Sequence, residues 1–145
     1  MKRRTDIDRL HEEIQELIDD LWHLPRFAGG RRGFRPAVDC IRSEDPAELK
    51  VVVELPGVEP SSIQVVAADR VLVVAGERRR PEVSGRYRQL EIEYGPFQRR
   101  IPLDEPVDTS AASAQYERGM LTVTLPIAAR PPTTERVSIT IRGRA

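Results

Sequence analysis

The sequence predicts an all-β fold, an antiparallel β-sandwich, with an amphipathic helix before it and an extended tail after it. Three observations support this prediction. Between residues 37 and 126, apolar side chains recur at every second position, which is typical of half-buried strands. Turn-forming pairs such as Pro56-Gly57 and Gly95-Pro96 separate these alternating segments. No helical pattern lies between them, which excludes a wholly parallel sheet with crossover helices.

Several short segments of this region are expected to be strands. Residues 71–76 are a short β-branched run closed by Gly76, and the other segments mostly have apolar residues at every second position. The segments are 49–55, 63–67, 71–76, 90–94, 97–101 and 121–125. Many short strands at such spacing favour a sandwich. The chain has three phenylalanines and one tryptophan, so we expect a core built from valine, isoleucine and leucine.

Residues 5–24 change to a helical period. Thr5, followed three residues later by Asp8, resembles a helix-capping pair, and Pro25 ends the pattern. The apolar stripe consists of Ile7, Leu10, Ile14, Leu17, Ile18, Leu21 and Trp22. The predicted organisation is therefore an N-terminal arm over 1–35, the sandwich domain over 36–127 and a C-terminal extension over 128–145. The arm ends in a linker rich in glycine and arginine.

The C-terminal extension contains one isolated alternating segment, Val137-Ser138-Ile139-Thr140-Ile141, after Pro131-Pro132. A single short strand cannot bury itself, so it is expected to add to an open sheet edge. The two prolines keep the spacer extended, which favours reaching a neighbouring subunit. Pairing with the segment's own domain is the alternative.

Composition limits the kinds of partner. The formal net charge is zero, which gives no general attraction to nucleic acid or to an anionic membrane. Cys40 is the only cysteine, so no intrachain disulfide forms, and we expect it to be a small apolar filler on a strand. The start "MKRRTDIDRL" has no apolar run typical of a secretory signal, and no long apolar span follows. These features predict a cytoplasmic protein.

The sequence predicts no catalytic, metal-binding or cofactor-binding residues. His11 and His23 both fall on the predicted helix, twelve residues apart, so they do not share one face at metal-ligand spacing. No phosphate-binding loop with Gly-Lys-Ser/Thr is present, so no ATP site is expected. The segment "GGRRG" at 29–33 lacks the strand-turn-helix context of a phosphate cradle. We therefore expect a protein that is not an enzyme.

Several motifs, in order along the chain, resemble the α-crystallin domain of small heat-shock proteins of the bacterial type. They are "ELPGV" at 54–58, "LVVAGER" at 72–78 and "AQYERGMLTVTLP" at 114–126. "RPAVDCIRSE" at 35–44 is similar to the first strand of that domain, and Ile139-Thr140-Ile141 to its Ile-x-Ile anchor. The resemblance implies an immunoglobulin-like sandwich. The stretch Leu103-Asp104-Glu105-Pro106 departs from the family, which usually has glycine in this turn.

The resemblance implies that the tail anchors an oligomer by binding a groove between two edge strands of another protomer. The anchor residues would be Ile139 and Ile141, with Val137 as a neighbouring candidate. The register stays open by two residues, because Val137-Ser138-Ile139 overlaps Ile139-Thr140-Ile141. The groove would be lined by Ile63, Val65, Ala114 and Tyr116.

The resemblance also implies that the loop over 77–95 carries a strand that swaps onto a partner to form a dimer. The matching residues are Tyr87, Arg88, Gln89 and Leu90. Arg99 lies on the same side of its predicted strand as Phe97 and Ile101, and the family has an arginine in the dimer interface here. The alternatives are a solvated turn for Arg78–Arg80 and an exposed edge position for Arg99.

The expected function is that of a small heat-shock protein, an ATP-independent holdase that binds partly unfolded proteins. It would work as an exchanging oligomer of dimers, with itself and non-native clients as partners, and without nucleic acid, membrane or ATP. Leu17, Ile18, Leu21 and Trp22 would contact clients or other subunits. One alternative is a monomeric co-chaperone-type adaptor for a specific protein. Another is a nucleic-acid binder using Arg26, Arg31, Arg32 and Arg35 in "RFAGGRRGFR".

Overall fold

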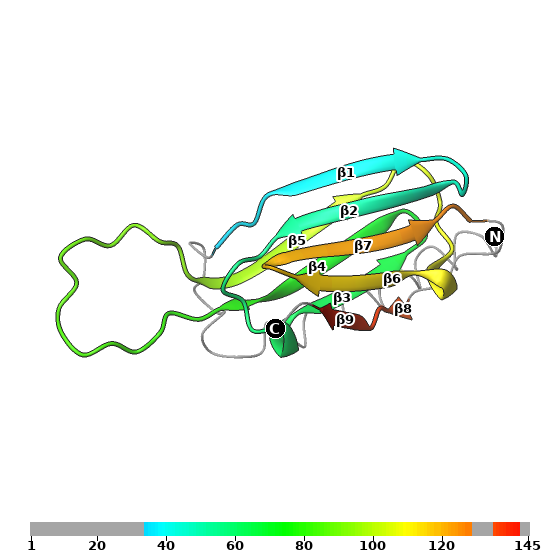
Figure 1. Ribbon diagram of the computed structural model, residues 1–145. Helices are drawn as coiled ribbons and strands as arrows, with labels where there is room; N and C mark the ends of the chain where they lie inside the picture. The colour runs from blue at the N-terminus through cyan, green and yellow to red at the C-terminus, as the bar shows by residue number, and fades with distance from the viewer. Residues whose placement is uncertain (1–33, 129–134, 143–145) are drawn as a thin grey trace, which may run out of the picture.

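A computed structural model describes residues 34–128 and 135–142, and these form a sandwich of two sheets (Figure 1). The helix expected over 5–24 lies outside the described residues. The strands are β1 (Val38–Ser43), β2 (Glu48–Glu54), β3 (Gln64–Ala68), β4 (Val71–Arg78), β5 (Gly95–Pro102), β6 (Ser113–Glu117), β7 (Met120–Pro126), β8 (Glu135–Arg136) and β9 (Ile139–Arg142). Two 3-10 turns are also present, η2 (Pro60–Ser62) and η3 (Thr109–Ala111).

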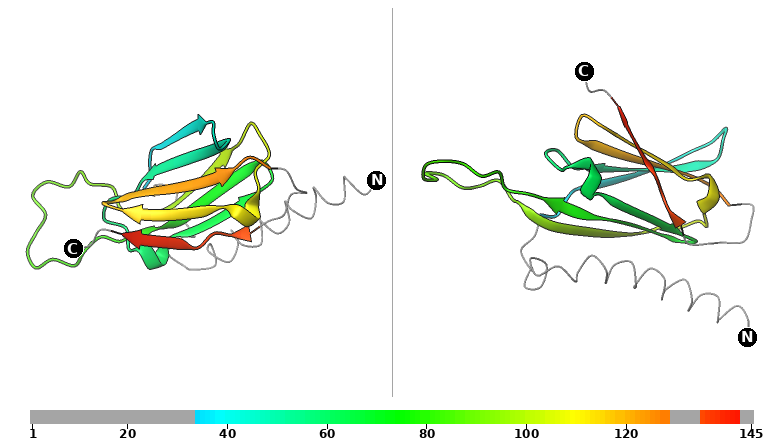
Figure 2. Two further views of the ribbon diagram at one scale, coloured as in Figure 1. Left: turned by 45° about the vertical axis from the view of Figure 1, so that its right-hand side comes forward. Right: turned by 90° about the horizontal axis from the view of Figure 1, so that it is seen from below.

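The described strands form two sheets that lie face to face (Figure 2). Sheet A has the strand order β1-β2-β7-β6-β9, and sheet B has the order β5-β4-β3-β8. Neighbouring strands pair antiparallel except β6 and β9, which pair parallel. The predicted antiparallel sandwich is therefore confirmed, with one parallel pair where the C-terminal segment joins sheet A.

The core follows directly from the alternation in the sequence. On β2 and β7 every second residue points inward, and the register places Val51 opposite Val123. β3 and β4 supply the facing layer, with Val65 opposite Val74. Phe97 and Tyr116 are the buried aromatic residues of a cluster that otherwise consists of valine, leucine, isoleucine and alanine. The expectation of an aliphatic core is confirmed.

Two glycines are required by the geometry of the turns and the core. Gly119 has φ +78°, and a Cβ there would lie 2.9 Å from the Cα of Pro56. Together with Arg118 at φ 55° it closes the two-residue hairpin between β6 and β7. A Cβ on Gly76 would lie 2.8 Å from Cζ of Phe97, so this glycine leaves room for the ring in the core.

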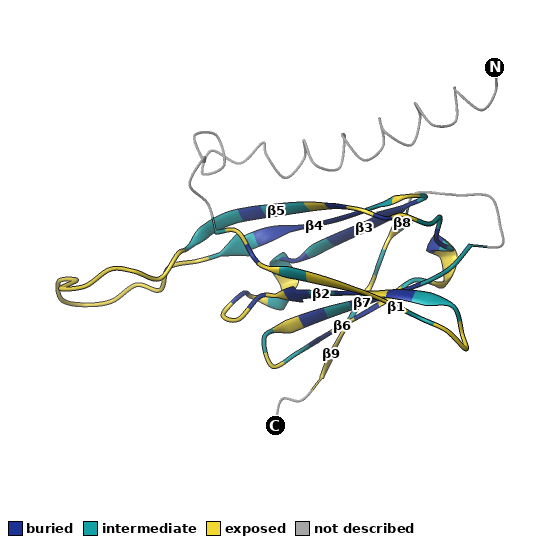
Figure 3. Cartoon of the chain, turned by 90° about the horizontal axis from the view of Figure 1, so that it is seen from above, coloured by how far each residue is buried: buried dark blue, intermediate teal, exposed yellow. Residues whose placement is uncertain are grey.

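Residues 90–94 are not a strand, although Leu90, Ile92 and Tyr94 alternate with polar residues. They belong to the long loop over 79–94 between β4 and β5, which projects away from the sandwich (Figures 1 and 3). A strand needs a neighbour to pair its N–H and C=O groups. Within the described part of the chain, no strand lies beside this segment, so the predicted strand does not form here.

Candidate functional site

The C-terminal segment connects the edges of the two sheets. β8 pairs with β3, and the Val137 amide donates to the Val65 carbonyl at 2.9 Å. The chain then reaches sheet A, where β9 runs parallel to β6 with Ile139 opposite Ala114. In Figure 1, β8 and β9 follow one another along one side of the sandwich. The segment thus lies between the edges of β3 and β6, where the tail-accepting groove was expected.

Within this chain the three candidate anchor residues differ in burial. Val137 and Ile139 pack partly buried against the core, whereas Ile141 is 60% exposed. Ile141 lies opposite Tyr116, next to Glu117, where β6 ends. Little of the sandwich remains there to cover it. The packed pair within the chain is therefore Val137 with Ile139, and the register of an anchor between protomers stays a prediction.

The occupied groove belongs to the same chain. The sequence favoured docking on another protomer and kept pairing with the segment's own domain as the alternative. In this structure of a single chain, the alternative is what is found. Docking of the tail onto a second protomer stays a prediction.

The residues expected to line the groove belong to the core itself. Ile63, Val65, Ala114 and Tyr116 each expose 8% of their surface or less. The Tyr116 hydroxyl donates to the Leu55 carbonyl at 2.6 Å, which ties β6 to the turn that follows β2. Burial raises the pKa of the Tyr116 hydroxyl, so it remains a donor at neutral pH.

The loop over 79–94 carries large apolar side chains in contact with water. Residues 79–93 are all exposed, and Tyr87, Leu90 and Ile92 expose 49%, 57% and 62% of their surface. The predicted dimer residues Arg88 and Gln89 lie between Tyr87 and Leu90 in the same exposed stretch. Figure 3 shows this loop in yellow, extending beyond both sheets. A loop of this composition is suited to binding another surface.

Arg78 holds the base of this loop, a role that sequence reasoning missed. Its Nε and Nη2 donate to the Glu93 carbonyl at 2.9 and 2.5 Å, and its Nη1 donates to the Pro56 carbonyl at 3.1 Å. Its guanidinium lies 3.8 Å from the centre of the Phe34 ring and 5.4 Å from that of Tyr94. Cation–π contacts of this kind add to the hydrogen bonds.

Arg79 and Arg80 differ from each other. Both side chains are exposed, but the Arg80 guanidinium lies 4.6 Å from the centre of the Tyr94 ring and 5.4 Å from that of Tyr87, whereas Arg79 pairs with Glu77 at 3.9 Å. A solvated turn describes Arg79 and Arg80, whereas Arg78 is held by its hydrogen bonds to Glu93 and Pro56. The signal that could have shown the role of Arg78 is the presence of two aromatic residues, Phe34 before β1 and Tyr94 at the end of the loop.

β1 forms an open edge of sheet A. It pairs with β2, and no second neighbour is present among residues 34–128 and 135–142. Ile41 is 50% exposed on this strand, and Cys40 is exposed as well. The expectation that Cys40 fills an apolar space is wrong, because an edge strand has fewer neighbours to cover its side chains. Partial desolvation, with a smaller effect of the Asp104 carboxylate, raises the pKa of the Cys40 thiol.

Arg99 lies on the core side of β5, as expected from Phe97 and Ile101, and it is partly buried. Its Nη1 donates to the carbonyl of the buried Pro36 at 2.6 Å, which connects β5 to the residues before β1. Desolvation, followed by repulsion from Arg35, lowers the pKa of Arg99. The partner of this charge is thus a backbone carbonyl of the same chain, and the expected dimer role stays a prediction.

The turn that departs from the family pattern is held by an ion pair. Leu103 is buried, and its amide donates to the Arg70 carbonyl at 2.8 Å. Glu105 accepts from Arg42 of β1 at 2.5 and 3.2 Å, and Arg42 also contacts Glu44. The hydrogen bond from Arg42 lowers the pKa of the Glu105 carboxyl. Glu105, in the turn where the family usually has glycine, is therefore fixed to β1 by an ion pair.

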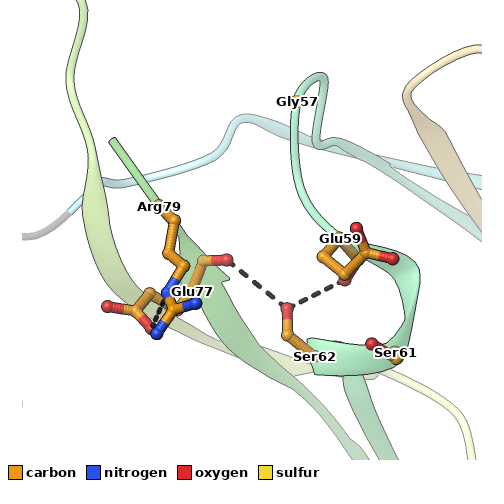
Figure 4. Close-up of a pocket in the computed structure, with 6 residues that line it drawn as sticks. All are labelled: Gly57, Glu59, Ser61, Ser62, Glu77 and Arg79. Carbon is orange, nitrogen blue, oxygen red and sulfur yellow. Dashed lines mark hydrogen bonds and ion pairs between the residues drawn. The ribbon is translucent and has the colours of Figure 1, made fainter. Parts of the chain in front are cut away.

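One polar pocket lies between η2 and the end of β4, lined by Gly57, Glu59, Ser61, Ser62, Glu77 and Arg79 (Figure 4). The Ser62 hydroxyl lies 2.9 Å from the Glu59 carbonyl and 3.4 Å from the Glu77 carbonyl, so it is engaged with the backbone. The pocket contains no histidine or cysteine to act with its serines. It does not form a nucleophile–base pair.

Some predicted residues fall outside the described ranges. These are the client-contact residues Leu17, Ile18, Leu21 and Trp22, together with Arg26, Arg31 and Arg32 of the linker. Within residues 34–128 and 135–142, no cluster of three or more histidine, cysteine, aspartate or glutamate side chains could hold a metal ion. The same part of the chain has no helix of the length and hydropathy needed to cross a membrane.

The geometry defines a class of protein: a β-sandwich with a strand-forming tail along one side and a long loop that exposes several apolar side chains. The family pattern described as "Hsp20/alpha crystallin family" matches residues 41–142. The chain belongs to the Hsp20/alpha crystallin family, the family of small heat-shock proteins.

Individual relatives agree with this assignment. The chain is 31% identical over 104 residues to the "Probable 15 kDa heat shock protein" of Leptospira interrogans, covering 72% of this chain and 77% of that protein. It is 40% identical over 85 residues to the "19.0 kDa class II heat shock protein" of Oryza sativa subsp. japonica. That match covers 53% of this chain and 49% of the rice protein, so the chain spans about half the length of that relative.

A solved structure shows the same fold. The chain is similar to "Heat shock protein 16.0 from Schizosaccharomyces pombe", with a TM-score of 0.62 and 28% sequence identity. The similarity covers 82% of this chain and 86% of that chain. The predicted family and sandwich fold are thereby confirmed.

Proposed function

We propose that this protein is an ATP-independent holdase that binds partly unfolded proteins and suppresses their aggregation. It would work as an exchanging oligomer built from dimers, without a catalytic residue. The observation that carries the proposal is the pair of sheet edges. One edge of sheet A is occupied by the tail and the opposite edge, β1, is open, while the loop over 79–94 exposes apolar residues.

The tail is held by few contacts. Complete burial of two aliphatic side chains gives roughly 3–6 kcal/mol in total, and Val137 and Ile139 are only partly buried. Ordering each residue of the segment costs about 1–2 kcal/mol, which opposes this gain, and each hydrogen bond returns only about 0.5–1.5 kcal/mol. Docking is therefore reversible, and the groove is suited to exchange of its occupant.

The same groove would accept the tail of a second copy. The hydrogen bonds and the two apolar contacts depend on residues 135–142 and not on which chain supplies them. One such contact is weak, but an assembly with many of them is held by avidity. Exchange between a chain's own tail and a neighbour's tail would then control the size of the assembly.

The open edge of β1 would accept the loop of a partner. β1 presents unpaired backbone groups and Ile41, and the loop presents Tyr87 and Leu90 with polar residues between them. Strand addition would pair the backbone of one with the other and cover the apolar side chains. The loop segment would thereby gain the neighbour that it lacks in a single chain. Arg99 would act beside this interface by fixing Pro36 before β1.

The assembly is tested by native mass measurement of the full chain and of a truncation after Arg130. We expect the full chain to form large species and the truncated chain to fall to small ones, with dimers retained. Circular dichroism would check that the truncated sandwich remains folded. An unchanged mass after truncation would remove the tail from the proposed assembly.

The chaperone activity is tested by heating an aggregation-prone client with the protein at equal subunit ratio, without nucleotide. We expect light scattering by the client to be suppressed, and added ATP to make no difference. A folded protein of similar mass and neutral charge is the control. If scattering is not suppressed under these conditions, the holdase proposal is wrong.

A monomeric adaptor for a specific partner is the second candidate. The observation that favours it is the tail itself, which fills the groove of its own chain and leaves that groove closed. Size-exclusion chromatography separates the two candidates. A single-chain mass at micromolar concentration would favour the adaptor, and a larger assembly would favour the holdase.

A further inference from the structure

The outer face of sheet B, the face that points away from sheet A, is apolar. Val66 and Ala68 of β3 alternate with the core residues of that strand, and Val71, Val73 and Ala75 of β4 do the same. Val66, Ala68 and Val73 form a cluster of their own, separate from the main core. Val66, Ala68, Val73 and Ala75 each expose 6% of their surface or less.

The described chain does not explain why this face is apolar. The sandwich partner of sheet B is sheet A, on the opposite side, and none of the described strands or 3-10 turns lies over the outer face (Figures 2 and 3). An antiparallel sheet face in contact with water normally carries polar residues. A face of valine and alanine is instead expected to be covered.

Basic residues border this apolar face on both sides. The strand register places Arg136, Val66, Val73 and Arg100 in one row across β8, β3, β4 and β5. Side chains in one row share a face, so the two valines lie between two arginines. Both arginines are exposed. The surface therefore suits an apolar stripe flanked by negative charge.

We propose that residues 5–24 of the same chain cover this face with their apolar stripe. The segment has seven acidic residues against one arginine, a net charge of 1 − 7 = −6, which complements the basic border. As a helix its 20 residues would be about 30 Å long, at about 1.5 Å per residue. The strands of β3 to β5, with five to eight residues, span about 17–27 Å.

The connection to the domain permits this placement. The described chain begins at Phe34, whose ring centre lies 5.7 Å from that of Phe97 on β5, so the arm leaves the domain beside sheet B. Nine residues, 25–33, separate Phe34 from the predicted helix, and they can span up to about 30 Å. A segment of this length reaches the outer face of its own sheet.

This inference rests on the proposed function, and it describes the state of the protein when no client is bound. With the arm in place, its stripe and the face of sheet B cover each other. When the arm leaves, both become available to exposed apolar segments of a client. Client binding and arm docking would then be mutually exclusive.

The single tryptophan of the chain, Trp22, belongs to the stripe and reports its environment. We expect low quenching of Trp22 by acrylamide in the full chain, at concentrations where its mass is smallest. The double variant R100E/R136E should lose this protection and shift the emission to longer wavelength, because both positions then repel the acidic arm. K50E/R118E carries the same change of charge at exposed positions on sheet A and should leave Trp22 protected.

A second variant changes the apolar face itself. Val66→Ser with Val73→Ser should expose Trp22, whereas Val52→Ser on the outer face of sheet A should not. The proposal is wrong if acrylamide quenches Trp22 equally in each of the two variants and in its control. Circular dichroism and thermal melting show whether the variant with both valines changed to serine still folds. If it does not, the result for R100E/R136E, which changes only exposed residues, tests the proposal.

Cross-linking distinguishes the chain's own arm from that of another copy. In a Cys40→Ser background, Ile18→Cys and Val73→Cys are joined with a short bis-maleimide. A linked single chain supports the proposal, and a linked dimer overturns it. The quenching and cross-linking experiments contain no client, so they test the arm separately from the chaperone activity. If Trp22 is protected from quenching but the client still aggregates, only the holdase proposal is contradicted. An exposed Trp22 with intact client protection would contradict only the docking of the arm.

Discussion

The two sides of the sandwich are completed in different ways. On one side the tail covers the edges of β3 and β6, and its Val137 and Ile139 are partly buried. On the other side β1 is open, and the loop over 79–94 exposes Tyr87 and Leu90 to water. The tail can therefore pair with the sheet edges of its own chain, whereas the loop projects away from both sheets and has no described strand of its own chain beside it (Figure 3).

The largest effect is expected from removing the loop. Replacing residues 80–93 with Asn-Gly would join β4 to β5 by a two-residue hairpin that fits their antiparallel register. The sandwich should fold, and dimer formation should be lost completely, because the segment proposed to cover β1 of the partner is absent. Analytical ultracentrifugation gives the mass. Arg79→Ala is the control and should not change it; a dimer that survives the replacement would contradict the loop's proposed role.

The tail side is tested by a matched pair of variants. Complete Ile→Ala truncation in a core costs about 2–5 kcal/mol, so the partly buried Ile139 should lose roughly 1–2 kcal/mol of docking energy when changed to alanine. Ile141→Ala should have almost no effect, because that side chain is mostly exposed. Hydrogen exchange at β6 and β9 measures docking. A loss for Ile141→Ala as large as that for Ile139→Ala would show that the anchor is Ile139 with Ile141.

A smaller effect is expected at the floor of the groove. Tyr116→Phe removes the hydrogen bond to the Leu55 carbonyl and should lower the free energy of unfolding by about 1 kcal/mol. Urea denaturation measures the loss as a lower midpoint. The exposed Tyr87 changed to phenylalanine is the control. An unchanged midpoint for Tyr116→Phe would mean that the hydroxyl contributes nothing to closing this side.

The smallest effect is expected at the open side, from Glu105→Gln. The Glu105 pKa is lowered in the folded protein by Arg42, so its contribution to stability is present above the ordinary carboxyl pKa. That contribution is lost as pH falls through the lowered value. The melting temperature of the variant should therefore lie slightly below that of the original protein at pH 7 and equal it in strong acid. A difference that persists unchanged in acid would exclude this carboxyl as its source.

The sandwich could be predicted because side-chain alternation is a local property that the folded sheet preserves. Leu121, Val123 and Leu125 are two residues apart in the sequence, and all three are buried in the core. At Leu90 and Ile92 the same alternation predicted a strand, but these residues lie in a loop. Alternation there is equally clear, but a strand also requires a neighbour, and the sequence pattern does not state where that neighbour lies.

Sequence reasoning also could not separate edge strands from central ones. Cys40 and Ile41 lie in a segment with the composition of any strand, yet they are exposed because β1 has one neighbour among the described strands. The anchor register depended on where the chain crosses from β3 to β6. That crossing is fixed by the hydrogen bond from Val137 to Val65, which joins residues distant in sequence.

The crossing of the tail from one sheet to the other has a consequence for mixtures of related proteins. Much of its attachment consists of main-chain hydrogen bonds, which nearly any extended peptide can form, and only two aliphatic side chains add to them. Such a receptor discriminates poorly between similar ends. Where a cell makes several proteins of this kind, we expect hybrid particles whose composition follows relative abundance more closely than pairwise selectivity.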